Sequence, residues 1–260
     1  MHQSVSRRFL GSYKLQKQTL PTYVRSITTR YYSAEVMDTA VSNTGTHNDE
    51  DYKMILRNST DQPWHFGIYQ KQPSSPGLTS VAWQVRGLPP MVGEVPPSAE
   101  VNWALEYGVC IADFDKDERK FTGIQFAPAH LGNNYKIVSL DGIPSISTTP
   151  TGTGNADQII LKNSTGPPAT KLSVGFTLSN KVVVVENDVG GLQKTLFRVH
   201  PTYYIACYRN IVPGQLVDIG VAIGPIVVRY DAGFHVAIVE AFKDSTGNYQ
   251  MKAKVVPSAE

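Results

Sequence analysis

A short motif occurs twice in this chain, and it constrains the fold more than any other feature. Met54–Thr60 reads Met-Ile-Leu-Arg-Asn-Ser-Thr, and 105 residues later Ile159–Thr165 reads Ile-Ile-Leu-Lys-Asn-Ser-Thr. After a three-residue gap, Phe66–Ile68 aligns with Val174–Phe176 around a shared glycine. Each copy is an apolar run, a polar turn and a second apolar run, which is the pattern of two strands joined by a turn.

The repeat predicts a body of two similar β halves. We place the first at 51–150 and the second at 151–260, joined by the Pro- and Gly-rich segment 142–157 and packed as one unit. Two hairpins are predicted in addition, one joining 107–113 to 120–126 and one turning at Asp231–Gly233.

Composition agrees with an all-β fold. The chain has 21 Gly and 17 Pro in 260 residues, and no part of the body repeats at the helical period over three turns. Many short strands with such turns predict a β-sandwich. No apolar run approaches eighteen residues, so no transmembrane segment is predicted.

The first fifty residues differ from the body in charge. Residues 1–32 hold six basic residues and no acid, whereas residues 33–50 hold four acids and no base. A basic, Ser- and Thr-rich start is typical of a mitochondrial transit peptide, and 30–34 looks like a matrix-protease site with cleavage after Tyr32. We predict a disordered or weakly helical extension, 1–50, made of a presequence-like segment and an acidic linker, and a mitochondrial location. A cytoplasmic protein with a basic tail is the alternative.

The charge of the body excludes one class of partner. Without the first 32 residues the chain has 18 basic against 22 acidic residues. A body with this balance has no electrostatic footprint for nucleic acid, so no nucleic-acid partner is predicted.

No catalytic or metal-binding motif is present in the sequence. It contains no G-x-S-x-G, Walker or G-x-G-x-x-G motif, and its six histidines never pair at metal-ligand spacing. Asp113, Asp115 and Asp117 suggest calcium, but an EF-hand loop would need Gly and Glu where Glu118 and Ile124 stand. A solvated turn is therefore favoured over calcium, and no cofactor or metal is predicted.

Two further pairs of residues, two cysteines and two asparagines, are interpreted as structural. Cys110 and Cys207 lie in apolar runs, and buried free thiols are favoured over a disulfide. Asn58 and Asn163 each begin an Asn-Ser-Thr sequon, and their repeated position favours turn chemistry over glycosylation.

Aromatic residues of the first half are the best candidates for binding. We select His65, Tyr69, Trp83 and Arg86 as ligand-binding residues, with core packing as the competing reading for the aromatic ones. Alternate side chains of a strand share a face, so His65 and Tyr69 point one way and Trp64 the other. At most half of this cluster can line one site.

Several segments resemble the rhizosphere-induced protein family, which is named for a rhizobial protein. The resemblance rests on Asn58–Thr60, Trp64–Gln70, Ser75–Leu78, Val81–Gly87, Tyr107–Val109, Asp115–Asp117 and Leu131–Tyr135. It covers about residues 52–185, while the basic N-terminus departs from the bacterial pattern and points to a eukaryotic member. The family has no established reaction, so the resemblance implies kinship and transfers no catalytic residue.

Three functions follow as hypotheses. The first is a non-catalytic β-sandwich that binds a small molecule, glycan or protein. The second is a membrane-active, lysin-like sandwich, motivated by the Tyr-rich segment 200–208. The third is an enzyme with a dispersed site around His65, Asp231 or His235.

Overall fold

The structure is a computed structural model that describes residues 52–71, 77–166, 171–218, 220–231 and 233–257. The predicted extension 1–50 and its cleavage site lie outside these ranges. The described residues form strands only, which confirms the all-β prediction. None of them forms a helix long and apolar enough to cross a membrane.

The strands are β1 (Tyr52–Asn58), β2 (Trp64–Tyr69), β3 (Leu78–Ser80), β4 (Gln84–Leu88), β5 (Ser98–Trp103), β6 (Tyr107–Asp115), β7 (Lys120–Pro128), β8 (Asn133–Leu140), β9 (Ile143–Thr153), β10 (Gln158–Asn163), β11 (Leu172–Leu178), β12 (Lys181–Val189), β13 (Lys194–Arg198), β14 (Thr202–Tyr208), β15 (Val221–Arg229), β16 (Val236–Lys243) and β17 (Tyr249–Val256).

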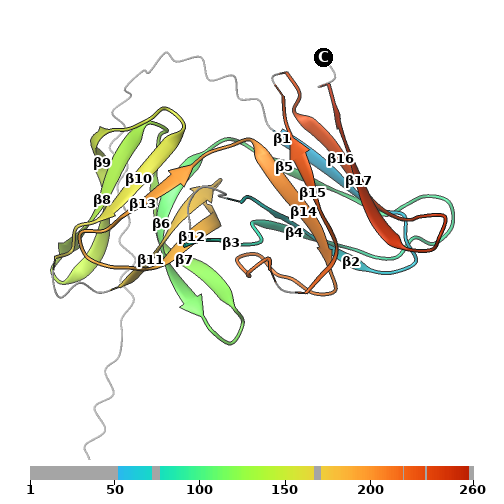
Figure 1. The fold of residues 1–260 in the computed structure, drawn as a ribbon, viewed down its shortest axis with the longest axis horizontal. Helices are drawn as coiled ribbons and strands as arrows, with labels where there is room; N and C mark the ends of the chain where they lie inside the picture. Colours follow the sequence, from blue (N-terminus) through green and yellow to red (C-terminus); the bar gives the residue numbers. More distant parts are fainter. Residues whose placement is uncertain (1–51, 72–76, 167–170, 219, 232, 258–260) are drawn as a thin grey trace, which may run out of the picture. The chain divides into compact units, whose positions relative to one another are not determined.

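These strands form four sheets (Figure 1). Sheet A has the order β17-β16-β1-β5 and sheet B the order β15-β14-β2-β4. Sheet C has the order β7-β6-β11-β12-β3 and sheet D the order β9-β8-β10-β13. Contacts between β15 and β17 join sheets A and B, and contacts between β7 and β9 join sheets C and D. We call A with B the first sandwich and C with D the second sandwich.

The two copies of the repeated motif occupy equivalent places. β1 is parallel to β16 and antiparallel to β5, and β10 is parallel to β8 and antiparallel to β13. The next strand of each copy crosses to the facing sheet, where β2 lies between β14 and β4, and β11 lies between β6 and β12. The two copies of the motif therefore have equivalent strand pairings.

The sandwiches do not coincide with the sequence halves 51–150 and 151–260. The first sandwich combines β1, β2, β4 and β5 with β14 to β17, whereas the second contains β6 to β13. Each stretch thus contributes strands to both sandwiches. Each sandwich therefore combines strands from both sequence halves, and neither sequence half forms a sandwich by itself.

A buried aromatic junction joins the sandwiches. Trp83 precedes β4, and its indole Nε1 donates a hydrogen bond to the backbone oxygen of Leu178 in β11, at 3.1 Å. Trp103 Nε1 donates to the hydroxyl of Tyr203 at 3.0 Å. The rings of Trp83, Trp103 and Tyr203 have centroids 5.0–5.9 Å apart. Because both indole N–H groups have acceptors, these large side chains are buried without an unsatisfied donor.

The segment 211–217, between β14 and β15, also fastens the sandwiches together. The backbone of Gly214 donates to Ala82 and accepts from Phe121 of β7, while Gln215 accepts from Ala82. Gly214 has a φ of +85°, and a Cβ there would lie 2.4 Å from the backbone oxygen of Phe121. Only glycine satisfies both the conformation and the approach.

Strand exchange predicts how a cut chain behaves. A protease site inserted in the exposed loop 154–157 of the full-length protein would, when cleaved, leave two fragments that each supply strands to both sandwiches. We expect the fragments to co-elute on size exclusion and to separate only in denaturant. Two fragments that elute separately while retaining their β-sheet signal would contradict this topology.

Candidate functional site

Four loops of the first sandwich lie at one end of it. β1 and β16 run in the same direction, and β2 runs against both β4 and β14. The connections that follow β1, β4, β14 and β16 therefore all leave at the same end: residues 59–63, 89–97, 209–220 and 244–248. We call this end the loop face. Loops grouped at one end of a sandwich are a common place for recognition, because the sheets hold them in position.

The second sandwich provides an internal comparison. The counterparts of these connections are residues 164–171, 190–193, 116–119 and 141–142. Three of the four are shorter than in the first sandwich, the exception being 164–171. The strand framework is shared, so the two sandwiches differ at this end in the length of their connections.

The turn after β1 is held by a buried asparagine. Asn58 Oδ1 accepts hydrogen bonds from the backbone and the hydroxyl of Thr60, at 3.1 and 2.8 Å. Its Nδ2 donates to the backbone oxygens of Gln62 and Pro89. Asn163 makes the matching bonds, accepting from Thr165 and donating to Val189. Both asparagines are 0% exposed, which confirms the turn chemistry predicted for the two sequons.

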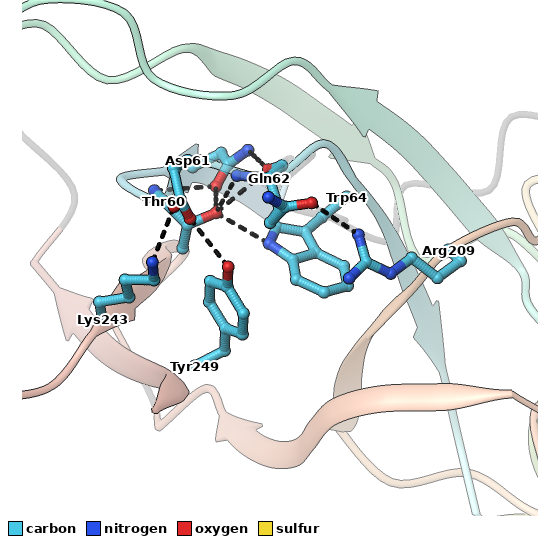
Figure 2. Close-up of polar contacts among 8 residues, drawn as sticks. Thr60, Asp61, Gln62, Trp64, Arg209, Lys243 and Tyr249 are labelled. Atoms are coloured by element: carbon cyan, nitrogen blue, oxygen red, sulfur yellow. Dashed lines mark hydrogen bonds and ion pairs between the residues drawn. The ribbon is translucent and has the colours of Figure 1, made fainter. Parts of the chain in front are cut away.

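A Trp–Arg pair stands on this turn in the first sandwich alone. Trp64 Nε1 donates to the Thr60 hydroxyl at 2.9 Å, and the guanidinium of Arg209 lies 4.3 Å from the Trp64 ring centroid (Figure 2). Arg209 Nη1 also donates to Gln62 Oε1 at 3.2 Å. The residue at the place of Trp64 in the second sandwich is Leu172, which has no N–H to donate. The turn therefore forms without an indole, and the described residues of the second sandwich contain no counterpart of the Trp64–Arg209 pair.

Asp61 organises the other side of the cluster. Its Oδ2 accepts from Lys243 Nζ at 2.7 Å, and its Oδ1 accepts from the Tyr249 hydroxyl at 2.8 Å (Figure 2). Hydrogen bonds from Lys243 and Tyr249 lower the pKa of Asp61, and the bond to Asp61 raises the pKa of Lys243. The Tyr249 ring meets Trp64 edge to face, with centroids 5.4 Å apart. We call Thr60, Asp61, Gln62, Trp64, Arg209, Lys243 and Tyr249 the cation–aromatic cluster.

The cation–aromatic cluster holds one guanidinium group, that of Arg209, in a position where it could bind a ligand. Lys243 is paired with the carboxylate of Asp61. The Arg209 side chain instead contacts the amide oxygen of Gln62 and the indole ring of Trp64, and both of these groups are neutral. Arg209 is exposed, and stacking on Trp64 holds its planar fork in place. A guanidinium fork fits the two oxygens of a carboxylate or phosphate.

The four residues selected from the sequence do not gather in one site. Trp83 is 1% exposed in the aromatic junction, and Tyr69 is 2% exposed and stacked on Tyr204. Burial raises the pKa of Tyr69 to about 12. His65 lies opposite Gly87 and Arg86 opposite Phe66, so His65 and Arg86 point to opposite faces of sheet B. A binding role for these residues stays a prediction.

The groups proposed for a dispersed catalytic site lie apart. His65 is near the loop face, where its Nδ1 lies 3.0 Å from the Arg209 backbone oxygen. His235 packs edge to face on Tyr52, at the start of β1 and thus at the opposite end of the first sandwich. Both cysteines are free and buried, and burial raises the pKa of Cys110 to about 12. A thiol in this state is a poor nucleophile at neutral pH.

The aspartate run forms a turn. Asp115 Oδ1 accepts from the backbone of Asp117 and Glu118, at 2.9 and 3.0 Å. Within the described ranges, no three His, Cys, Asp or Glu side chains are grouped so that they could hold a metal ion.

Sequence reasoning missed most of the cluster. Arg209, Lys243 and Tyr249 reach Asp61 and Trp64 from the far end of the chain, through the pairing of β14 with β2 and of β16 with β1. Of these residues only Trp64 carries a local signal, as an aromatic at the start of a strand.

The asparagine framework predicts matched losses of stability. Asn58→Ala removes the buried amide that donates to the backbone oxygens of Gln62 and Pro89, and Asn163→Ala removes the donor to the buried backbone oxygen of Val189, so each should cost about 1–3 kcal/mol of the free energy of unfolding. Arg209→Ala removes an exposed side chain and should stay within about 0.5 kcal/mol. Urea denaturation of the three variants measures this. If either asparagine variant matches the parent protein, the side-chain amide is not what holds the turn.

Comparison with known proteins agrees with the resemblance seen in the sequence. The RhiA family model matches residues 49–254. The chain is 26% identical over 175 residues to Protein RhiA of Rhizobium leguminosarum bv. viciae, an alignment that covers 65% of this chain and 72% of that protein. No solved structure matches. Because the family match spans most of the chain, including both sandwiches and the loop face, the chain belongs to the RhiA family.

Proposed function

We propose that the protein is a non-catalytic binding protein that contacts its ligand through the loop face of the first sandwich. The observation that carries this proposal is the difference between the two sandwiches. They share the Asn-Ser-Thr turn and the strand pairing, but in the first sandwich the other three connections are longer and an arginine stacks on the tryptophan beside that turn. The longer connections and Arg209 are not needed for the shared turn and strand pairing, so they are available to contact a ligand.

The geometry of Arg209 supports the same proposal. Fixing a long side chain on binding costs conformational free energy. Arg209 is already held by stacking on Trp64 and by its hydrogen bond to Gln62, so less of this free energy is lost when a ligand binds. The cluster draws its residues from two of the four loop connections and from the adjoining ends of β2, β16 and β17. A contact made there is held by both sheets of the first sandwich.

The membrane-active alternative loses the feature that motivated it. Tyr203 is 1% exposed and Tyr208 is 0% exposed, and the hydroxyl of Tyr208 donates to the backbone of Val217. Two of the three tyrosines in this segment are thus part of the interior. They do not offer rings to lipid headgroups.

A ligand screen tests the proposal. Thermal shift of the full-length protein against inorganic phosphate, short carboxylates and neutral and acidic glycans should give ligands whose binding weakens about tenfold or more in Arg209→Ala. Lys254→Ala removes an exposed lysine that lies outside the loop face and should bind as the parent protein does. Ligands that bind equally well to both variants would place recognition elsewhere.

The similarity of the halves supports a proposal about origin. We infer that an ancestral unit of eight strands was duplicated, and that each sandwich now combines four strands from each copy. The repeated motif and the equivalent pairing of β1 and β10 support this. Under the same proposal β3, which pairs with β12 alone, is a later addition.

A mitochondrial location remains a proposal that rests on the charge of residues 1–32. Mass spectrometry of the protein isolated from its native cell should find a mature N-terminus at Ser33. An intact Met1 would overturn the processing and favour a cytoplasmic protein.

A further inference from the structure

We propose that the loop face binds a single-headed amphiphilic anion, a molecule with one carboxylate or phosphate group on an apolar chain. This inference rests on the proposed function and names the ligand class. Arg209 would hold the oxyanion, and the loop 89–97 would contact the apolar chain.

Arg209 is the one cation of the cluster that is free to take an anion. Both carboxylate oxygens of Asp61 are engaged, Oδ2 by Lys243 and Oδ1 by Tyr249. The acid nearest to Arg209 in the cluster is therefore committed elsewhere. Arg209 donates from Nη1 to the neutral amide oxygen of Gln62, and its guanidinium group stacks on the Trp64 ring. Its other N–H donors are left for a ligand.

The loop 89–97 supplies apolar surface in a fixed position. Val92 is 86% exposed and Val95 is 80% exposed. The loop is nevertheless anchored to the turn after β1, because Asn58 Nδ2 donates to Pro89 at 2.6 Å and the backbone of Met91 donates to Thr60 at 2.7 Å. Its far end is anchored as well, since the backbone of Asn58 donates to Pro97 at 2.9 Å. Because the loop is anchored at both ends, these two apolar side chains offer a ligand contact area that binding does not first have to order.

A series of contacts links the loop 89–97 to Arg209. Thr60 accepts from Met91 through its backbone oxygen and from Trp64 through its hydroxyl. Trp64 in turn lies under Arg209. An anionic head on Arg209 would therefore be held next to the turn that anchors the loop.

The remaining charges decide against an extended anionic partner. Glu94 stands between the two valines, and Asp218 and Asp244 lie in other loops of the same face. Acids outnumber cations across the loop face once Asp61 and Lys243 are paired. A membrane rich in anionic lipid would bring many negative charges against these acids, whereas a molecule with a single head brings one charge to Arg209.

Titration calorimetry of the full-length protein tests the inference. The probes are decanoate and monodecyl phosphate, each below its critical micelle concentration, decanol below its solubility limit, inorganic phosphate, and vesicles of phosphatidylglycerol. Decanoate or monodecyl phosphate should bind at least about tenfold more tightly than decanol and than inorganic phosphate, because each comparison removes one of the two contacts.

Variants separate the two contacts. Arg209→Ala should weaken the binding of monodecyl phosphate about tenfold or more, and Arg209→Lys should restore only part of it because the fork is lost. Val92→Asp with Val95→Asp should weaken it similarly, while Glu94→Gln should strengthen it. Leu192→Asp changes an exposed apolar residue in the corresponding loop of the second sandwich; it is the control and should have no effect.

The failures are distinguishable. Equal affinity for monodecyl phosphate and inorganic phosphate, both lost in Arg209→Ala, would overturn the apolar contact and leave the proposed binding at the loop face intact. Binding to vesicles without binding to either single-chain anion would overturn the inference in favour of a lipid surface. Amphiphile binding that survives both Arg209→Ala and the double valine change would overturn the inference and the proposed function together.

Discussion

The side-chain amide of Asn58 is the interaction on which the loop face depends. It joins the turn after β1 to the loop after β4 by donating to Gln62 and Pro89. It also fixes Thr60, whose hydroxyl takes the indole N–H of Trp64, and Trp64 then supports Arg209. A polar group that is fully buried is costly unless every bond is made, so this amide specifies one arrangement of two loops. Asn163 does the same in the second sandwich with less built upon it.

Local pattern predicted the strands better than their partners. The repeated motif predicted equivalent strands, and the hairpin of β6 with β7 is confirmed. The hairpin predicted at Asp231–Gly233 is wrong, because β15 pairs with β14 while β16 pairs with β1 and β17. Turn residues reverse the chain in the same way whether the next strand stays in its sheet or crosses to the facing one. The choice of sheet is made by packing, which a single sequence does not display.

The site was harder to predict than the fold for a related reason. Aromatic composition drew attention to Tyr69 and Trp83, yet both are buried, since the same ring that suits a ligand also suits a core. Arg209, Lys243 and Tyr249 look like ordinary surface residues until strand register brings them to Asp61 and Trp64. Periodicity says which face of a strand a residue occupies. It does not say which distant loop will lie beside that residue.

The exchange of strands between the sandwiches has a consequence for the chain during its synthesis. The loop face begins with residues 59–63, but Lys243 and Tyr249 are added only when β16 and the start of β17 have been made. Until then β1 and β2 can pair only with β5 and β4 and lack β16 and β14, whereas all strands of the second sandwich, β6 to β13, have already been made. We therefore expect the second sandwich to fold first, with the long-range pairing of β1 with β16 and of β2 with β14 last. A chain that ends before β16 can hold every strand of the second sandwich and still lack the Lys243 and Tyr249 contacts of the loop face.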